Sequence, residues 1–346
     1  CAILKPMNTP FLMTSSPAYQ RQAIAELRAV DPKAGALGPL APEVLRFTPT
    51  LDRDAFLRAF QDHSPIFIRH LHPADQVTAP DLGAITAAVG PLLASVRPGE
   101  RIAVQGRKLG REEAAGEGAL TRTALKEALD ALIERAGGHP VIQAPDRILS
   151  VSWDAQNAYT GLSSPAENLS DWTGGEVRFR REEEQVSRAR FKLLEALARF
   201  DLRLVNDGHA LDLGAAPGGW TSLLLERGMH VTAVDTGELA PTVRQHPLLT
   251  FRQENVEQVN FPPDTFDVIT CDMSWNPLHT ARLVARLAPA VKAGGDGILT
   301  VKLMLENPTR TIRQVTEIIA ETFEVLRIKQ LYHNRDEVTL HLRRRR

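Results

Sequence analysis

Short apolar runs alternate with amphipathic stretches over the second half of the chain, and this alternation predicts a doubly wound α/β domain. Five runs that end at a turn or a polar residue predict parallel strands, at 209–213, 229–235, 251–255, 265–273 and 297–303. Helical patterns lie between or beside them, at 187–195, 220–225, 278–291 and 310–322. Two closing runs, 323–332 and 337–342, flank a turn and predict an antiparallel hairpin. We therefore expect a mostly parallel seven-stranded sheet that ends in a hairpin.

The first half of the chain has a different order of elements. Strands are predicted at 65–71, 101–107 and 147–153, and helices near 79–89 and 121–136, which is an α+β order. The first residues are rich in proline, alanine and polar side chains, with one helical stretch at 18–29. We expect an N-terminal appendage at 1–44, an α+β domain at 45–165, a linker at 166–186 and the α/β domain at 187–346.

Length and composition favour a soluble protein of two or three domains. The chain has 346 residues, of which 43% are hydrophobic and 24% charged. No apolar run reaches the roughly 18 residues of a membrane span, and the first residues do not resemble a signal peptide. We expect a cytoplasmic protein with no membrane partner. Cys1 and Cys271 lie far apart without a CxxC pattern, so neither a disulfide framework nor a metal site is expected.

Positive charge is concentrated in a few segments, although the net charge is only −1. The basic residues of two segments are Arg97, Arg101, Arg107, Lys108 and Arg111, and then Arg178, Arg180, Arg181, Arg188, Arg190 and Lys192. Such clusters can follow the phosphates of RNA, and a solvated charged surface is the alternative. Four arginines, 343–346, end the chain, and there a solvated tail is the simpler interpretation.

A glycine-rich string, Asp212-Leu213-Gly214-Ala215-Ala216-Pro217-Gly218-Gly219-Trp220-Thr221, joins the first strand to the next helix. Glycines let the backbone approach a ligand, and the helix that starts near Gly219 directs unpaired N–H groups at it. Asp235 ends the second strand about 20 residues later, where a carboxylate meets ribose hydroxyls. A dinucleotide and S-adenosylmethionine both fit this spacing. Pro217 stands where a pyrophosphate would need close approach, which favours S-adenosylmethionine.

Two further polar residues end strands of the predicted sheet. Asp272 follows the fourth strand, and Lys302 follows the apolar sequence 298–301 in the fifth. Open α/β sheets bind their ligands at the carboxyl ends of the strands, so Asp235, Asp272 and Lys302 should face one crevice. A lysine seldom follows such a buried strand without a specific role.

Four segments carry a resemblance to a known family. They are Ser187-Arg188-Ala189-Arg190-Phe191-Lys192-Leu193, the glycine-rich string, Cys271-Asp272-Met273 with Val301-Lys302-Leu303, and the segment 331–339. Over residues 187–344 the chain resembles the FtsJ-type ribose 2′-O-methyltransferases, and among them the THUMP-linked, RlmM-like branch. The resemblance implies an S-adenosylmethionine-dependent Rossmann-like methyltransferase domain and an RNA partner rather than DNA. The implied substrate is a cytidine of large-subunit (23S) ribosomal RNA.

The resemblance also implies the site residues. The family's Lys-Asp-Lys-Glu tetrad falls on Lys192, Asp272, Lys302 and Glu337. The expected cofactor contacts are Asp212, Gly214, Ala215, Pro217, Gly218, Gly219, Trp220, Asp235, Asn255 and Asp272. Packing is a second interpretation for Trp220, and Asn255 stands where the family often has an aspartate near the adenine.

In the first half, the strand 101–105 with the basic pair after it and the segments 145–148 and 158–162 resemble a THUMP domain. This RNA-binding module is attached to several tRNA-modifying enzymes. An unrelated α+β domain that packs against the enzyme is the alternative.

Methyl transfer to a ribose hydroxyl needs a group that takes the hydroxyl proton, because this hydroxyl is almost fully protonated at neutral pH. A lysine can do so if burial or a neighbouring cation lowers its pKa. We therefore expect Lys302 to act as general base with Lys192 near it. Asp272 would orient Lys302, while Lys192 and Glu337 would position the ribose and the base.

Other functions have to be weighed. A base N-methyltransferase needs an Asn-Pro-Pro-Tyr-like turn, which 272–277 does not supply. A carbon-5 pyrimidine methyltransferase would use Cys271 as nucleophile. A tRNA methyltransferase with a THUMP domain and a catalytically inactive RNA-binding ribosome-assembly factor remain as alternatives. The sequence does not define the modified nucleotide, the particle or free RNA that serves as substrate, or the oligomeric state.

Overall fold

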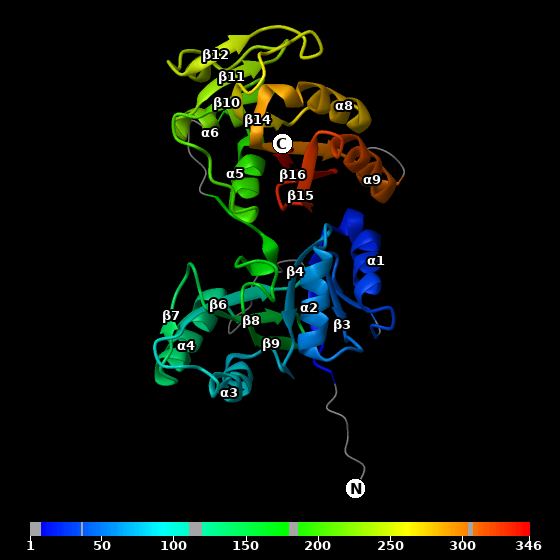
Figure 1. The fold of residues 1–346 in the computed structure, drawn as a ribbon. Helices are drawn as coiled ribbons and strands as arrows, with labels where there is room; N and C mark the ends of the chain where they lie inside the picture. Colours follow the sequence, from blue (N-terminus) through cyan, green and yellow to red (C-terminus); the bar gives the residue numbers. More distant parts are fainter. Residues whose placement is uncertain (1–7, 36, 111–119, 180–185, 304–306) are drawn as a thin grey trace. The chain divides into compact units, whose positions relative to one another are not determined.

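The computed structural model describes residues 8–35, 37–110, 120–179, 186–303 and 307–346. The chain divides into two compact units, Cys1–Val177 and Arg178–Arg346 (Figure 1). Within the described residues, no helix is long and apolar enough to cross a membrane.

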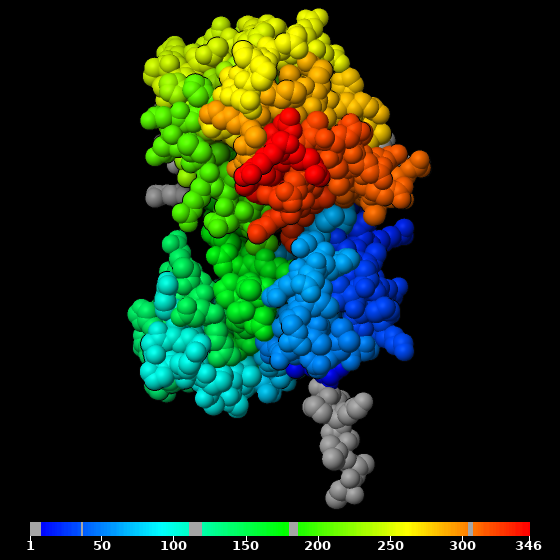
Figure 2. All heavy atoms as spheres, viewed as in Figure 1, coloured from blue at the N-terminus to red at the C-terminus, as the bar shows by residue number. Residues whose placement is uncertain are grey.

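The second unit contains one seven-stranded sheet in the order β12-β11-β10-β13-β14-β16-β15. Its strands are β10 His209–Leu213, β11 His230–Val234, β12 Leu249–Arg252, β13 Phe266–Cys271, β14 Val291–Lys302, β15 Phe323–Lys329 and β16 Glu337–Arg344. Strands β10 to β14 pair in parallel, and β16 pairs antiparallel with both β14 and β15. The prediction of an α/β sheet with a terminal hairpin is confirmed. Figure 2 shows the C-terminal segments of this unit, in orange and red, packed together.

The helices of this unit are α5 Ala189–Arg199, α6 Gly219–Glu226, α7 Pro241–Arg244, α8 Pro277–Leu287 and α9 Pro308–Ile319. Asn276 and Asn307 cap α8 and α9 through their side-chain oxygens, and a proline follows each cap. Helix α8 ends at Leu287 rather than at the expected residue 291, because a short 3-10 turn with Pro289 follows it. Strand β14 accordingly begins at Val291, six residues before the expected start.

The core beside the glycine-rich string joins α5 and α6 to the sheet. Leu193 and Leu224 are fully buried in it, together with Val231 of β11. Trp220 is 3% exposed, and its indole N–H donates to the Ala189 carbonyl at 2.8 Å. A buried indole with a satisfied N–H is a packing residue. Trp220 therefore fixes the start of α5 against α6.

The first unit contains two sheets. The four-stranded sheet has the order β2-β3-β1-β4, from β1 Phe11–Ser15, β2 Gly38–Ala41, β3 Val44–Phe47 and β4 Ile68–Pro73. Helices α1 Gln20–Val30 and α2 Arg53–His63 belong to the same part of the chain. The expectation of an N-terminal appendage needs correction for its described residues. All five residues of β1 are buried, and β1 pairs with both β3 and β4.

The five-stranded sheet has the order β5-β9-β8-β6-β7. Its strands are β5 Gln76–Thr78, β6 Arg101–Lys108, β7 His139–Pro140, β8 Arg147–Trp153 and β9 Ala158–Ser163, with helices α3 Leu82–Leu93 and α4 Arg122–Arg135. The expected strands and helices of this region are all present, in an α+β order. The first part of the expected linker, up to Val177, packs on this unit, since a Cβ on Gly175 would lie 2.9 Å from the Arg69 carbonyl oxygen.

A buried histidine links the stability of the first unit to pH. The His72 ring donates from Nδ1 to the Pro73 carbonyl at 2.9 Å, so Nε2 accepts from the Ser152 hydroxyl at 2.9 Å. Burial lowers the pKa of His72 to about 4, the hydrogen bond to Pro73 opposes the shift, and the charge of Arg107 adds to it. The neutral ring is therefore the form that the folded chain holds.

We expect the unfolded chain to take up a proton at His72 as the pH falls below about 6.5, which the folded chain resists down to about pH 4. The stabilisation is complete above pH 6.5 and is lost over this interval, by about 3 kcal/mol in the free energy of unfolding. Urea unfolding at pH 7 and pH 4.5 tests this, with His72→Gln as the matched neutral variant. An equal pH dependence in both proteins would contradict the prediction.

Candidate active site

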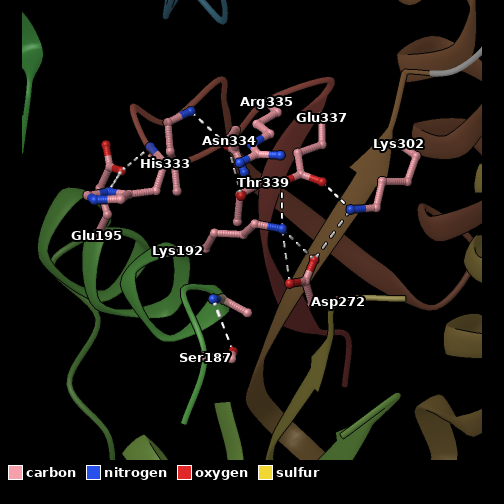
Figure 3. A network of polar contacts seen from close by, with 12 residues as sticks. Ser187, Lys192, Glu195, Asp272, Lys302, His333, Asn334, Arg335, Glu337 and Thr339 are labelled. Carbon is pink, nitrogen blue, oxygen red and sulfur yellow. Dashed lines mark hydrogen bonds and ion pairs between the residues drawn. The ribbon is translucent and has the colours of Figure 1, made fainter. Parts of the chain in front are cut away.

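Four charged side chains meet at the carboxyl edge of the parallel strands, each from a different element (Figure 3). Lys192 comes from α5, Asp272 follows β13, Lys302 ends β14 and Glu337 begins β16. The antiparallel register of β14 and β16 places Lys302 directly opposite Glu337. The structure thus brings together the four residues of the expected tetrad.

The four side chains alternate in charge. Lys192 Nζ donates to both oxygens of Asp272 at 3.1 Å and lies 2.6 Å from Glu337 Oε1. Lys302 Nζ donates to Glu337 Oε2 and lies 3.8 Å from Asp272 Oδ1. Each carboxylate therefore lies between two ammonium groups, and the cluster, which we call the tetrad, has no net charge.

Burial and neighbouring charge act in opposite directions in the tetrad. Burial lowers the pKa of Lys192, but the carboxylates of Asp272 and Glu337 outweigh it, and the pKa lies above its ordinary value. Burial raises the pKa of Asp272 more than the two ammonium groups lower it. Burial also raises the pKa of Glu337, but Lys192 and Lys302 reverse this and hold it below its ordinary value. Lys192 lies near Lys302, as expected, in the sense that both lysines pair with the same two carboxylates, Asp272 and Glu337.

Asp235 ties two loops together beside this edge. Its Oδ2 accepts the Ala216 N–H at 2.9 Å, and its Oδ1 accepts the Gly237 N–H at 2.7 Å. Gly214 has a φ of +72°, and a Cβ there would lie 2.3 Å from Cγ of Met273, in the loop after Asp272. The glycine loop therefore contacts the segments after β11 and β13. Asp235 keeps lone pairs that can accept from ribose hydroxyls, so these residues fit S-adenosylmethionine.

Two of the expected cofactor contacts, Asp212 and Trp220, instead hold the elements on either side of the glycine loop together. Asp212 is 1% exposed and accepts from Thr221 Oγ1 at 2.6 Å and Thr270 Oγ1 at 2.8 Å. Burial raises its pKa to about 6, against the two hydroxyl hydrogen bonds. Its oxygens thus hold the strand and helix together beneath the loop, as Trp220 does between α5 and α6.

The two adjacent glycines pack against neighbouring side chains. Gly218 has a φ of +111° and lies against Val243, and a Cβ on Gly219 would meet the Ser187 hydroxyl at 2.3 Å. Ala215 is 5% exposed. Next to Gly218, the Ala216–Pro217 peptide bond is cis. The loop is therefore closely packed against α5 and the segment that contains α7.

Asn255 lies beyond the end of β12. Its Oδ1 accepts the Glu257 N–H at 2.9 Å, which forms a local turn. Cys271 is 1% exposed, and burial raises the pKa of its thiol to about 12. A buried, protonated thiol is a poor nucleophile, which argues against carbon-5 chemistry at this residue.

The expected RNA contacts of the first unit divide into two kinds. Arg107 is largely buried and lies 3.0 Å from both Glu43 and Glu176, so it is part of the fold rather than a phosphate contact. Arg97 is 83% exposed at its side chain. Arg111 lies outside the described residues, as do Arg180 and Arg181 of the second basic segment.

Glu195 and Asn334 hold the turn before Glu337, and neither is among the site residues expected from the sequence. Glu195 is 1% exposed and Asn334 is 3% exposed. An acidic residue within the apolar face of a predicted helix was the only available signal for Glu195, because charged residues are almost never fully buried without a partner.

Comparison with known proteins shows what the second unit is similar to. Residues 185–335 match the model of the FtsJ-like methyltransferases. The chain is 36% identical over 195 residues to "Ribosomal RNA large subunit methyltransferase M" of Halorhodospira halophila, covering 55% of this chain and 56% of that protein. It is 33% identical over 233 residues to the Pseudomonas aeruginosa protein of the same name, covering 62% and 64%.

The chain thus covers less than two thirds of the length of these relatives. Among solved structures, TrmN from Thermus thermophilus aligns with a TM-score of 0.39 and 13% identity, over 97% of this chain and 100% of that one. The match to the family model confirms the resemblance expected from the glycine-rich string: residues 185–335 are similar to the FtsJ-like methyltransferases.

Proposed function

We propose that this protein is an S-adenosylmethionine-dependent ribose 2′-O-methyltransferase that acts on large-subunit ribosomal RNA, with a cytidine as the expected target. The observation that carries the proposal is the tetrad, in which a lysine at the end of β14 lies between two carboxylates beside the cofactor loops. The relatives named as large-subunit ribosomal RNA methyltransferases support the choice of RNA.

The cofactor loops would hold the methyl donor through a few groups. The Asp235 carboxylate would accept from the ribose hydroxyls of the donor, and the close-packed Gly214 to Gly218 turn would place the donor over the strand ends. S-adenosylmethionine supplies an electrophilic methyl group on a sulfonium. Asp212 and Trp220 keep this loop in place without touching the donor.

We assign Lys302 as the group that removes the proton of the ribose 2′-hydroxyl. S-adenosylmethionine would supply the methyl group, and the ribose hydroxyl would be its acceptor. The base in this scheme is the deprotonated amine of Lys302, whose Nζ would take the proton that the hydroxyl releases. Asp272 and Glu337 then stabilise the ammonium group that forms, because both lie within ion-pair distance of Nζ. Lys192 holds the same two carboxylates in place from α5. Alignment of donor, hydroxyl and lysine supplies a further part of the rate, up to about 7–11 kcal/mol in favourable cases.

The first unit is the part we assign to RNA binding, as a THUMP-like domain over about 45–165 that uses β1 and α1 for support. The exposed Arg97, together with Arg101 and Lys108 on β6, would meet the phosphate backbone. Arg107 is not assigned to this role, because it forms ion pairs with Glu43 and Glu176 within the fold.

Replacement of Lys302 tests the catalytic role. We expect Lys302→Met to lower the rate of methyl transfer by about 10²–10⁴-fold, because the hydroxyl loses its proton acceptor. Affinity for S-adenosylmethionine, measured by calorimetry, should stay near that of the unchanged protein. The rate is measured on ribosomal RNA from cells that lack the gene.

Lys292→Met is the matched control, since Lys292 lies on the same strand and pairs with Asp267 at 2.7 Å. It should leave the rate unchanged. Near-normal methyl transfer by Lys302→Met would exclude Lys302 as the base. Methylation of transfer RNA but not of ribosomal RNA would overturn the proposed substrate.

Replacement of basic residues tests the RNA-binding role of the first unit. We expect Arg97→Ala and Lys108→Ala each to weaken RNA binding and to lower the slope of log affinity against log salt by about one. Filter binding over a range of salt concentrations measures both quantities. Lys33→Ala, at an exposed position of the same unit, is the control. An unchanged slope in both variants would place the RNA elsewhere.

A further inference from the structure

We infer that Glu195 is a positioning residue for methyl transfer, which sets the place of Glu337 by holding the turn that precedes β16. This inference rests on the proposed function. Glu195 lies on α5 and does not contact Lys302 or Asp272 among the described hydrogen bonds and ion pairs (Figure 3). It acts on the tetrad through the backbone of the turn.

Glu195 accepts three hydrogen bonds from two adjacent residues. Its Oε1 accepts the Tyr332 N–H at 2.8 Å, and its Oε2 accepts the His333 N–H at 2.9 Å. The same Oε2 lies 2.8 Å from Nδ1 of His333. Because a carboxylate can only accept, Nδ1 carries the proton in this contact. One carboxylate thus fixes both the backbone and the ring of the turn.

The turn is held at further points that lead directly to Glu337. Asn334 Oδ1 accepts the Leu331 N–H at 2.8 Å and the Thr339 hydroxyl at 3.1 Å. The Leu303 N–H donates to the Asp336 carbonyl at 2.7 Å. These bonds tie the turn to β16 and to the end of β14. A shift of the turn would therefore move Glu337 relative to Lys302.

Lys192 and Glu195 are three residues apart on α5, so they lie on the same side of the helix. Lys192 contacts Glu337, and Glu195 contacts the turn four residues before it. Helix α5 is thus joined to the same hairpin by two residues of opposite charge. Two contacts therefore define the distance between Lys192 and Glu337. One is their direct ion pair, and the other is the bond from Glu195 to the turn before β16.

Rings pack around the same turn. Phe191 and Phe179 lie 5.3 and 5.7 Å from the His333 ring, measured between centroids. Their rings are also stacked on each other at 5.8 Å. This packing limits the rotation of His333 and keeps its Nδ1 directed at Glu195.

Glu195 is 1% exposed, so its carboxylate oxygens depend on partners within the fold. Those partners are the backbone N–H groups of Tyr332 and His333 and the His333 ring. An apolar side chain at this place in α5 would leave both N–H groups without this acceptor. A buried acid that fixes one turn therefore points to positioning, and a displacement of about 1 Å can cost about 10²-fold in rate.

The test combines substitutions at both ends of this connection. Glu195→Gln loses the charge and directs an amide N–H₂ at one of the donors, so the turn is held less tightly. We expect single-turnover methyl transfer to slow by about 10- to 100-fold, with unchanged affinity for S-adenosylmethionine. Glu226→Gln is the matched control, because Glu226 also pairs with α5, through Arg190 at 2.6 Å, and is half exposed. It should keep the normal rate.

A double-substitution cycle separates positioning from a general structural effect. If Glu195 acts through Glu337, then Glu195→Gln should slow a Glu337→Gln protein by less than about threefold. The inference would be overturned if the rate losses of the two single substitutions multiply in the double variant, or if Glu195→Gln alone has a normal rate.

His333→Phe keeps the backbone donors and the ring packing of the turn, so it replaces Glu195→Gln as the test if that variant does not fold. It should slow transfer by about threefold or more, and a normal rate would overturn the inference. Failure of the proposed function is distinguishable, because the unchanged protein would then form no 2′-O-methyl product.

Discussion

The alternation of two ammonium groups and two carboxylates at one edge of the sheet is the interaction on which the rest of the second unit depends. Charges this well buried are stable only when each has an opposite charge within reach. Each member of the tetrad comes from a different element, so the set forms only when α5, β13, β14 and β16 are all in place. The site is therefore a direct product of the fold.

The topology of the sheet explains why these elements meet. Parallel strands end at one edge, which brings the loops after β10, β11 and β13 together. Strand β16 runs in the opposite direction, and its first residue therefore lies at that same edge, opposite the last residue of β14. A carboxylate at the beginning of an antiparallel strand thus reaches a site that is otherwise built from strand ends. Glu195 and the turn before β16 fix this last contribution.

Much of the fold could be predicted from the sequence, because apolar runs and helical patterns alternate clearly in the second unit. The tetrad residues could be named because they fall in family motifs, but their partners could not, since contacts between distant segments leave no local pattern. Asp212 and Trp220 were expected at the cofactor, yet their side chains point into the core, and a strand sequence does not say which oxygen a neighbouring threonine will reach. Arg107 was similarly expected at RNA, and its two glutamate partners lie 64 and 69 residues away in sequence.

The most direct measurement asks which atom receives the methyl group. Large-subunit ribosomal RNA from cells that lack the gene is incubated with the protein and methyl-labelled S-adenosylmethionine, and is then hydrolysed in alkali. Alkaline cleavage needs a free 2′-hydroxyl, so a ribose 2′-O-methyl group leaves its label in an alkali-stable dinucleotide. If the tetrad directs the methyl group to a ribose hydroxyl, the label remains in dinucleotides. Label in mononucleotides would show methylation of a base and would contradict the proposed reaction.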